Sequence, residues 1–439
     1  MNIEEGVDKM YYFIGIKGAG MASLAVILKQ LGNTVVGSDV DKHFFTESEL
    51  IRNNIPFFPY DEANIKEGYT IIKGASITED NIELQKAREL NLKILEYNEM
   101  VGILTKDFKT ICVAGCHGKT TTTNMLALAL KNIGVNYLIG DGTGSAFADN
   151  SYFALESCEY RRHFLEYHPY YTIITNIDLD HVDYFKDIDD VIDAYSSLAN
   201  KSSKLVIACG DDQNVRKMKL KKDIVYYGLG EENDIRATNI EYKSTGISFN
   251  VNGYGYFDLP IYGEHQLLDA LAVIAFCRLE CIDYRDVYNN LKEFKGARRR
   301  FTERKINNNI IIDDYAHHPN EVKATINAIR QKYSAKKIIA IFQPHTFSRT
   351  KEFSDKLVEI FKEVDASYIL DIHPAREKAT DFPGITSDII IDKLDNCYHI
   401  DISEADKLAK YDNAVFIFMS PNDISKLEDS LAEKLENNK

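Results

Sequence analysis

The chain of 439 residues exceeds the usual size of one hydrophobic core, so we expect two or three domains. Its composition, 45% apolar and 27% charged, is that of an ordinary globular protein. The net charge of −15 argues against nucleic acid as a partner, because a duplex binder needs a cationic face to displace counterions.

The sequence lacks the signals of a secreted or membrane-spanning protein. Residues 1–8 do not have the basic and apolar regions of a signal peptide. The most apolar helical stretch, residues 267–277, is about half as long as the ~20 residues that span a bilayer. The 7 cysteines are scattered without a CxxC pair, which favours buried, reduced thiols. We therefore expect a cytoplasmic protein without membrane insertion.

The first block, residues 1–106, alternates predicted strands with predicted helices. An apolar strand over residues 11–16 and a glycine-rich turn precede a helix over residues 21–31. The remaining elements are strands over residues 34–38, 69–73 and 92–95 and a helix over residues 80–90. This alternation is typical of a parallel sheet covered by helices.

The second block, residues 107–298, begins with a strand over residues 110–114, a glycine loop and a long helix. Residues 235–259 differ, because short alternating runs separated by glycines favour antiparallel strands. An apolar helix over residues 264–279 closes the block. Further strands are predicted over residues 152–155, 171–175 and 205–208.

The third block, residues 299–439, repeats the alternation. It has predicted helices from Pro319 and from Ser348 and a charged helix at its end. Its strands are predicted over residues 309–313, 337–342, 367–371 and 414–419. The predicted fold class is therefore α/β with three domains.

A phosphate-binding loop follows the first strand of the second block. Its sequence is Gly115-Cys116-His117-Gly118-Lys119-Thr120, and the next helix begins with the threonines Thr120 to Thr123. Glycines let backbone N–H groups approach phosphate oxygens, and Lys119 and the helix N-terminus favour negative charge. The Thr120 hydroxyl is suited to magnesium. Val113 makes the motif shorter than a full P-loop, so a chance glycine turn stays the alternative.

A second group of glycines, Gly15-Ile16-Lys17-Gly18-Ala19-Gly20, also follows a strand and opens a helix. Asp39 ends the second strand, about where a dinucleotide fold binds a ribose. The spacing is not G-x-G-x-x-G because position 23 is serine. A nucleotide diphosphate at the helix end and a simple tight turn therefore both stay open.

Several segments at predicted strand ends carry polar side chains that bind metals or substrates. Carboxylates and a histidine at the carboxyl ends of parallel strands converge on the ligand crevice, and oxygen ligands favour magnesium. Each second-block segment alone is equally compatible with a solvated loop, and any single histidine of the third block is compatible with a structural residue or a helix cap. Three polar segments in succession at strand ends favour a site in the third block. In the second block they are 156–159 and 178–183, and in the third block 313–319, 343–349 and 373–377.

In combination, these segments resemble the Mur ligases over essentially the whole chain and in the family's order. The segments that carry the resemblance are Phe13 to Met21, Gly115 to Thr121, Thr175 to Ile177 with Asp180-His181, Gly296 to Phe301, Asp313 to Pro319, and Phe342 to Thr350. The resemblance implies a Rossmann-like N-terminal domain, a central P-loop-type domain and a Rossmann-like C-terminal domain. Two segments, Asp313 to Pro319 with its two adjacent histidines and Gln343-Pro344-His345, resemble those of the family member that adds alanine.

The resemblance implies ATP-dependent ligation of L-alanine to the lactyl carboxylate of UDP-N-acetylmuramate, by a monomer or homodimer with two Mg²⁺ ions. The implied catalytic residues are Lys119, Asn176, His181, Arg299 and Arg300, and the implied metal ligands are Thr120, Glu159 and His181. The implied ATP site comprises Gly115, Cys116, His117, Gly118, Lys119, Thr120, Thr121, His265, Gln266, Asp269 and Asp314. The implied UDP-sugar site is Lys17, Gly18, Ala19, Gly20, Ser38 and Asp39, and the implied amino-acid site is Tyr315, His317, His345 and Arg349.

Some positions depart from the family pattern. Lys17 stands where the family usually has glycine, and Gln266 and Asp269 stand where it generally has asparagines. Aspartate lacks the amide donor of asparagine, which weakens the transfer of adenine contacts. The segment Ser420-Pro421-Asn422-Asp423 replaces a glycine-alanine-glycine run, and proline cannot adopt the positive φ of glycine.

Three other functions stay open from the sequence. A ligase that attaches a tripeptide to the same UDP-sugar uses the same phosphate chemistry and differs only in the acceptor pocket. A nicotinamide-dependent oxidoreductase accounts for Gly15 to Gly20 and Asp39 but leaves Lys119, Glu159 and His181 without a role. A nucleotide-binding protein without activity is the non-enzymatic alternative.

Overall fold

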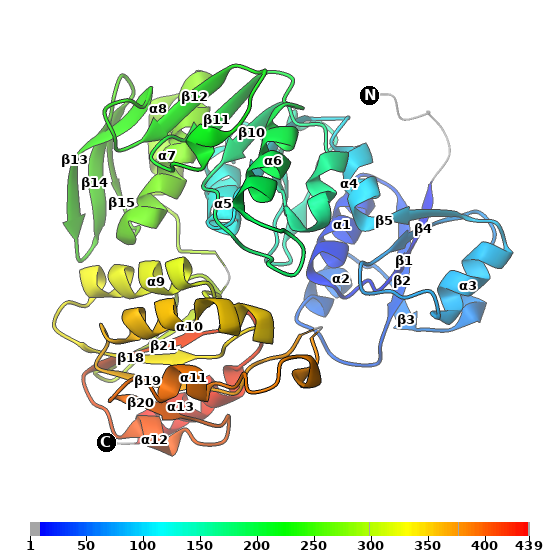
Figure 1. The fold of residues 1–439 in the computed structure, drawn as a ribbon. Helices are drawn as coiled ribbons and strands as arrows, with labels where there is room; N and C mark the ends of the chain where they lie inside the picture. The colour runs from blue at the N-terminus through cyan, green and yellow to red at the C-terminus, as the bar shows by residue number, and fades with distance from the viewer. Residues whose placement is uncertain (1–8, 298, 376, 438–439) are drawn as a thin grey trace. The chain divides into compact units, whose positions relative to one another are not determined.

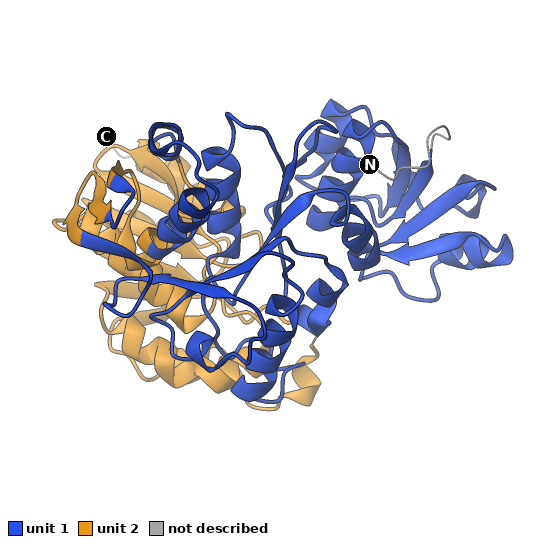
Figure 2. Cartoon of the chain, turned by 90° about the horizontal axis from the view of Figure 1, so that it is seen from above, with its two compact units in different colours: residues 1–238, 251–255, 268–293 blue, residues 239–250, 256–267, 294–439 orange. Residues whose placement is uncertain are grey.

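The computed structural model describes residues 9–297, 299–375 and 377–437. Residues 1–8, in which no signal peptide is predicted, lie outside the described part of the chain, as does position 298 of the Gly296–Phe301 motif. The chain divides into two compact units, shown in Figure 2. The first unit comprises residues 1–238, 251–255 and 268–293, and the second comprises residues 239–250, 256–267 and 294–439.

The N-terminal sheet has five parallel strands in the order β3-β2-β1-β4-β5. The order reverses between β1 and β4, which is where ligands bind in doubly wound sheets. Its strands are β1 (Met10–Ile14), β2 (Thr34–Asp39), β3 (Phe57–Pro59), β4 (Tyr69–Lys73) and β5 (Lys93–Glu96). Its helices are α1 (Ala19–Gln30), α2 (Glu47–Arg52), α3 (Ile82–Glu89) and α4 (Tyr97–Leu104).

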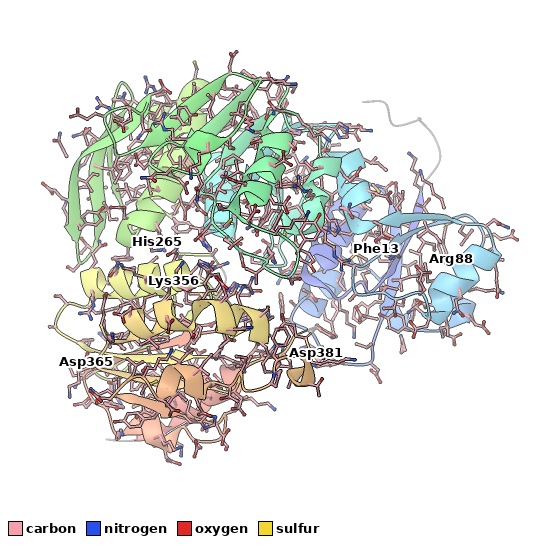
Figure 3. The ribbon with its side chains drawn as sticks, in the orientation of Figure 1. Phe13, Arg88, His265, Lys356, Asp365 and Asp381 are labelled. Carbon is pink, nitrogen blue, oxygen red and sulfur yellow. The ribbon has the colours of Figure 1, made fainter. Side chains whose placement is uncertain are left out.

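Alternation along β1 decides which helix covers which face of this sheet. Tyr11 and Phe13 join a core that includes residues of α1, α2 and α4 (Figure 3 labels Phe13). Tyr12 and Ile14 point to the other face and pack with Leu84 of α3. Successive side chains of a strand alternate between faces, so an apolar run such as β1 needs helices on both sides.

The central sheet has ten strands in the order β15-β14-β13-β12-β11-β10-β6-β9-β7-β8. They are β6 (Lys109–Ala114), β7 (Val135–Leu138), β8 (Gly144–Ser145), β9 (Tyr152–Glu156), β10 (Tyr171–Ile174), β11 (Leu205–Cys209), β12 (Ile224–Gly228), β13 (Ile235–Lys243), β14 (Gly246–Val251) and β15 (Gly255–Leu259). The helices of this part are α5 (Lys119–Ala129), α6 (Ile188–Ala199), α7 (Gly263–Leu279) and α8 (Tyr284–Leu291). β6 lies between β9 and β10 and is parallel to both, so the carboxyl ends of these three strands meet at one edge.

The C-terminal sheet has six strands in the order β16-β17-β21-β18-β19-β20, with only the β16–β17 pair antiparallel. Its strands are β16 (Thr302–Ile306), β17 (Asn309–Asp314), β18 (Lys337–Phe342), β19 (Ala366–Ile369), β20 (Cys397–His399) and β21 (Ala414–Met419). Helices α9 (Pro319–Lys332) and α10 (Phe347–Phe361) cover one face, and α12 (Asp406–Ala409) and α13 (Ser425–Asn437) cover the other (Figure 1). The short helix α11 (Asp388–Ile391) precedes β20.

The α/β fold class is confirmed, with one sheet in each of the three predicted blocks. The predicted strands over residues 69–73, 337–342 and 414–419 match β4, β18 and β21 in full. No helix among the described residues is long and apolar enough to cross a membrane. All 7 cysteines are free thiols, and Cys158 and Cys281 are exposed rather than buried.

A buried carboxylate ties the N-terminal sheet to α3. Glu83 is fully buried and accepts hydrogen bonds from the Tyr12 hydroxyl at 2.8 Å, the Asn64 amide at 2.9 Å and the Asp61 backbone N–H at 3.1 Å. The Ser38 hydroxyl donates to its second oxygen. These donors come from β1, β2 and the turn after β3, so one side chain joins three parts of the domain.

We predict that Glu83→Ala destabilises the chain by about 3 kcal/mol, because buried donors lose their charged acceptor. Urea unfolding of the full chain measures the change. Glu89→Ala is the matched control, because Glu89 on the same helix is exposed and pairs with Lys86. The control is expected to stay within about 0.5 kcal/mol of the unmodified chain, and equal losses in both variants would contradict the assignment.

Candidate active site

The phosphate-binding loop has the backbone geometry that only glycine tolerates. Gly115 has φ +143° and Gly118 has φ +81°, and Gly118 directly precedes α5. A Cβ at Gly115 would lie 2.0 Å from Oγ1 of Thr175, and one at Gly118 would lie 2.3 Å from Oδ1 of Asp269. Both the conformation and the close packing therefore exclude other residues, and the predicted strand–loop–helix arrangement is present.

The segment after β10 holds the loop in place. The Asn176 side chain accepts from the His117 N–H at 2.9 Å and donates to the His117 carbonyl at 2.9 Å. The Thr175 hydroxyl donates to the same carbonyl at 2.6 Å. The structure thus places Asn176 against the loop, where its amide fixes both sides of the His117 backbone.

Lys119 forms an ion pair with the buried carboxylate of Glu159 at the start of α5. Nζ of Lys119 lies 3.1 Å from Oε2 of Glu159 and also donates to the carbonyls of Gly115 at 2.5 Å and Cys116 at 3.1 Å. Glu159 is 1% exposed. Burial lowers the pKa of the Lys119 ammonium, but the Glu159 carboxylate outweighs it and the pKa is raised, so the lysine is charged at neutral pH.

A cluster suited to a metal ion lies beside this pair. Glu159, Asp180 and His181 each offer a ligand atom, and these atoms all lie within 4.8 Å of one another. Nδ1 of His181 is buried without a hydrogen-bond partner among the described residues, and its Nε2 lies 3.6 Å from Glu159. Carboxylate oxygens with one imidazole fit magnesium, so these residues can hold the expected cation. Two predicted ligands, Glu159 and His181, are therefore together, and Asp180 joins them.

Thr120, the other predicted metal ligand, contacts a different carboxylate. Its hydroxyl donates to Glu156 at 2.9 Å, and the other oxygen of Glu156 accepts from the Gly140 N–H at 2.6 Å. Glu156 and Asp180 lie in the predicted polar segments 156–159 and 178–183, but the site residues implied by the resemblance did not include them. The signal for them was present, because Glu156 ends β9 and Asp180 lies in the acidic segment after β10.

The residues predicted for adenine lie on one helix, α7, but have different local partners. Asp269, in the first unit, is 5% exposed and accepts from the Thr122 hydroxyl at 3.1 Å. Gln266, in the second unit, accepts from the Tyr262 N–H at 2.9 Å. Partial burial and the nearby Arg300 guanidinium lower the pKa of His265 to about 4, so its imidazole is neutral at physiological pH. The Asp269 carboxylate is thus a hydrogen-bond acceptor for a threonine in the first turn of α5.

A pocket of about 440 Å³ lies at the carboxyl ends of β2 and β4 in the N-terminal domain, beside the reversal of strand order. Asp39 lines it and accepts from the backbone N–H of Lys17 at 2.7 Å and of Val40 at 2.8 Å. The full set of lining residues is Asp39, Val40, Phe44, Tyr60, Ser76, Ile77, Thr78, Asp80 and Asn81. Its volume falls in the range of small-molecule sites.

Other residues predicted for the UDP-sugar make packing and hydrogen-bond contacts within the N-terminal domain. The Ser38 side chain is fully buried against Glu83, and its carbonyl accepts from the N–H groups of Gly15 and Ile16. Gly18 precedes α1, which begins at Ala19. A Cβ at Gly20 would lie 2.9 Å from the Tyr97 hydroxyl oxygen, so this glycine is needed for packing.

The residues predicted for the amino acid meet at the carboxyl ends of β17, β18 and β19. The ring centroids of His317 and His345 are 5.8 Å apart, and Nη1 of Arg349 lies 3.1 Å from Nδ1 of His345. The ring of Tyr315 lies 5.8 Å from that of His317. His373, which lies in the predicted polar segment 373–377 but was not assigned to the amino acid, stacks on His345 with ring centroids 5.7 Å apart.

Asp314 and Arg299 are occupied by structural contacts within the C-terminal unit. Asp314 accepts from the N–H groups of Phe301 and Ala316, both at 2.8 Å, and burial raises its pKa to about 6. Arg299 pairs with Asp313 at 3.1 Å and donates to the carbonyls of Ser420 at 2.9 Å and Asn422 at 2.8 Å. Arg299 therefore fixes the segment that replaces the family's glycine-rich run. Arg300 lies over the Tyr315 ring, 4.8 Å from its centroid.

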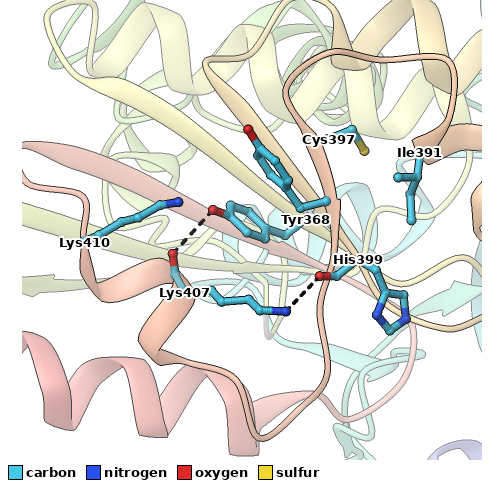
Figure 4. Close-up of a pocket in the computed structure, with 7 residues that line it drawn as sticks. Tyr368, Ile391, Cys397, His399, Lys407 and Lys410 are labelled. Atoms are coloured by element: carbon cyan, nitrogen blue, oxygen red, sulfur yellow. Dashed lines mark hydrogen bonds between the residues drawn. The ribbon is translucent and has the colours of Figure 1, made fainter.

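A second pocket, of about 510 Å³, lies at the β20 edge of the C-terminal sheet (Figure 4). It is lined by Tyr368, Ile391, Cys397, Tyr398, His399, Lys407 and Lys410. None of the residues predicted for the site lines it, so we assign it no part in the chemistry.

The chain has three β-sheets flanked by helices, and its phosphate loop lies beside an acidic cluster. Together these features define a nucleotide-dependent ligase. The chain belongs to the Mur ligase family. It matches the family's catalytic-domain model over residues 10–109, the middle-domain model over 113–277 and the glutamate-ligase-domain model over 299–418.

Two relatives at 45% identity share one name. The chain is 45% identical over 427 residues to the UDP-N-acetylmuramate–L-alanine ligases of Lacticaseibacillus casei and of Lacticaseibacillus paracasei, covering 96% of this chain and 97% of each relative. The solved UDP-N-acetylmuramate–alanine ligase of Thermotoga maritima is 25% identical with a TM-score of 0.82 and covers 98% of this chain and 100% of its own. A murein peptide ligase from Psychrobacter arcticus, 19% identical with a TM-score of 0.71, covers 98% of this chain and 99% of its own and shares the fold.

We predict that Gly118→Ala weakens ADP binding more than about 10-fold in titration calorimetry, because the loop cannot keep its conformation. Gly134→Ala is the matched control: Gly134 also has positive φ, +83°, and a Cβ there would also lie 2.3 Å from an oxygen, Oδ1 of Asn150. Both variants are expected to lose stability, whereas the control keeps its ADP affinity. Equal ADP affinities in the two variants would contradict a phosphate-binding role for the loop.

Proposed function

We propose that this protein ligates L-alanine to the lactyl carboxylate of UDP-N-acetylmuramate, converting ATP to ADP and phosphate, as a step in peptidoglycan precursor synthesis. The observation that carries the proposal is the 45% identity over 96% of the chain to relatives named for this reaction. The intact loop and the Lys119–Glu159 pair support it. ATP and the UDP-sugar are cytoplasmic metabolites, so we propose a cytoplasmic location.

The chemistry requires activation of a carboxylate, which is a poor acylating agent. The lactyl carboxylate attacks the γ-phosphorus of ATP, ADP leaves, and an acyl phosphate forms. The deprotonated amine of alanine then attacks the acyl carbon, and phosphate leaves as the amide forms. Each step needs positive charge at phosphate oxygens and little water near the acyl phosphate.

The first-unit residues support the phosphoryl step. Lys119, charged and fixed at the loop, neutralises phosphate oxygens, and backbone N–H groups at the start of α5 add to this. Glu159, Asp180 and His181 would hold a magnesium ion, which supplies further charge neutralisation when bound. A second ion, with Thr120 as a ligand, stays part of the proposal.

We assign the amino-acid acceptor to the C-terminal cluster and the UDP part to the N-terminal pocket. Arg349 is 9% exposed and has a planar guanidinium suited to the carboxylate of alanine. The neighbouring imidazoles of His317 and His345 suit the amine end. The pocket of about 440 Å³ with Asp39 at its wall fits a nucleoside.

The test of function is phosphate release from ATP with purified full chain and UDP-N-acetylmuramate. Release that depends on L-alanine supports the proposal. Release that ignores alanine, or no release, refutes it. Release that requires the tripeptide instead of alanine identifies the recycling ligase.

We predict that Lys119→Ala lowers kcat by roughly 10²–10³-fold, as loss of one charged group at a reacting centre does. Lys131→Ala is the control, because Lys131 lies beyond the far end of α5 and pairs with Glu293. Circular dichroism checks that both variants are folded. Near-normal phosphate release by a folded Lys119→Ala chain would refute the role of this lysine.

We predict that Arg349→Lys raises the KM for L-alanine about 10-fold, because lysine cannot make a bidentate contact with a carboxylate. The KM for ATP is expected to change less. Arg330→Lys, an exposed position on α9, is the control. An unchanged KM for alanine in Arg349→Lys would show that Arg349 does not bind the carboxylate of alanine.

A further inference from the structure

Lys17 is a buried cation in the turn between β1 and α1. The resemblance predicts it as a contact of the UDP-sugar, and its 7% exposure is low for a lysine. A buried ammonium is costly unless all of its N–H groups find acceptors. Its partners therefore decide whether it is available to a phosphate.

The ammonium of Lys17 already has three acceptors. It pairs with Oε1 of Glu47 at 2.9 Å and donates to the carbonyls of Lys42 at 2.8 Å and Val40 at 3.1 Å. A lysine has three N–H donors, so these contacts use its full capacity. The hydrogen bond from Lys17 lowers the pKa of Glu47 to about 2, which keeps the carboxylate charged at neutral pH. Diphosphate binding would require one of these bonds to break.

The main chain of Lys17 contacts the same part of the domain. Its N–H donates to Oδ2 of Asp39 at 2.7 Å, and its carbonyl accepts from the Thr46 hydroxyl at 2.5 Å. All of these partners lie between Asp39, the last residue of β2, and Glu47, the first residue of α2. The intervening stretch, residues 40–46, is here called the β2–α2 segment, and it contains no helix or strand.

The β2–α2 segment forms part of the N-terminal pocket of about 440 Å³. Val40 and Phe44 of the segment line the pocket together with Asp39, whereas Lys17 does not line it. A segment without regular structure has few backbone hydrogen bonds of its own, so its shape depends on side-chain contacts. Lys17 supplies four hydrogen bonds or ion pairs to residues 40–47, and the ring of Phe44 lies 5.9 Å from its ammonium.

We propose that Lys17, with Glu47 as its counter-charge, is a positioning residue that holds the β2–α2 segment as a wall of the pocket for the nucleoside end of the UDP-sugar. Lys17 acts through the segment and makes no contact with the diphosphate. The identity of the ligand rests on the proposed function. The arrangement of Lys17 and the segment does not.

Calorimetry of UDP and of uridine binding to the full chain separates this role from a phosphate contact. Lys17→Met is expected to weaken UDP and uridine by the same factor, about 10-fold, because the nucleoside wall is lost. Glu47→Gln is expected to weaken both about threefold. A direct phosphate contact gives the opposite pattern: Lys17→Met would weaken UDP alone, and Glu47→Gln would release the lysine and strengthen UDP binding. Either result overturns the proposal.

Amide hydrogen exchange tests the segment without any ligand. Lys17→Met and Glu47→Gln are expected to speed exchange in residues 40–47 and to leave the loop at residues 115–120 unchanged. Lys86→Met is the matched control, because this half-exposed lysine pairs with Glu89 on α3. Unchanged exchange in residues 40–47 of both folded variants overturns the proposal even if nucleotide affinity falls.

Steady-state kinetics complete the test. The KM for UDP-N-acetylmuramate is expected to rise about 10-fold in Lys17→Met, with kcat and the KM for ATP changed less than about twofold. A matching fall in kcat would contradict a role limited to the pocket wall. If the unmodified chain binds neither UDP nor uridine, the ligand assigned to this pocket is wrong, while alanine-dependent phosphate release still decides the proposed function and the exchange result alone decides whether Lys17 holds the segment.

Discussion

The buried ion pair between Lys119 and Glu159 is the interaction on which the candidate site depends. The buried Glu159 carboxylate needs this partner, because an unpaired buried ion costs several kcal/mol, about 3–5 kcal/mol when one partner is removed. The pair also joins two elements of the sheet edge, since Lys119 starts α5 and Glu159 follows β9. It keeps the lysine charged and folded back on the carbonyls of its own loop. A phosphate that enters the loop would compete with Glu159 for this ammonium, and a cation beside Glu159 would ease that exchange.

The sheet order explains why residues far apart in the sequence reach this pair. β6 has β9 on one side and β10 on the other, all parallel, so their carboxyl ends open on the same edge. The glycine loop follows β6, Glu156 ends β9, and Thr175 and Asn176 follow β10. The N-terminal sheet repeats the principle, with its pocket at the ends of β2 and β4.

Much of this could be predicted from the sequence, because the informative patterns are local. Apolar runs bounded by glycine and polar clusters located β4, β18 and β21 in full, and the strand–loop–helix context identified the loop at Gly115 to Thr120. Short elements without a clear period, such as β8, β20 and α12, were missed because their pairing depends on the rest of the sheet. The exposed thiols of Cys158 and Cys281 were likewise not visible from composition.

The sequence was least informative about what each charged side chain contacts. A lysine or arginine near a phosphate motif suggests a phosphate contact, yet Lys17 and Arg299 direct their donors to carbonyls and carboxylates of their own domains. Asp314 likewise accepts backbone N–H groups of its own turn. Hydrogen-bond saturation of a buried charge is a property of the folded chain and leaves no spacing rule in the sequence.

The pairing of cations inside the domains also affects how selectively a chain with net charge −15 binds anionic substrates. Free cations at the pockets would attract any phosphate, so selectivity for one nucleotide would be poor. Cations paired inside the protein instead fix the shape of a wall or loop, and the shape selects the ligand. Lys119 combines both roles in the proposed function, since it is paired with Glu159 while it lies at the loop proposed to receive phosphate. The difference between Lys119 and Lys17 is therefore one of partners. Lys119 pairs with a carboxylate of the acidic cluster and with carbonyls of its own loop, whereas Lys17 gives its N–H groups to Val40, Lys42 and Glu47 beside the N-terminal pocket.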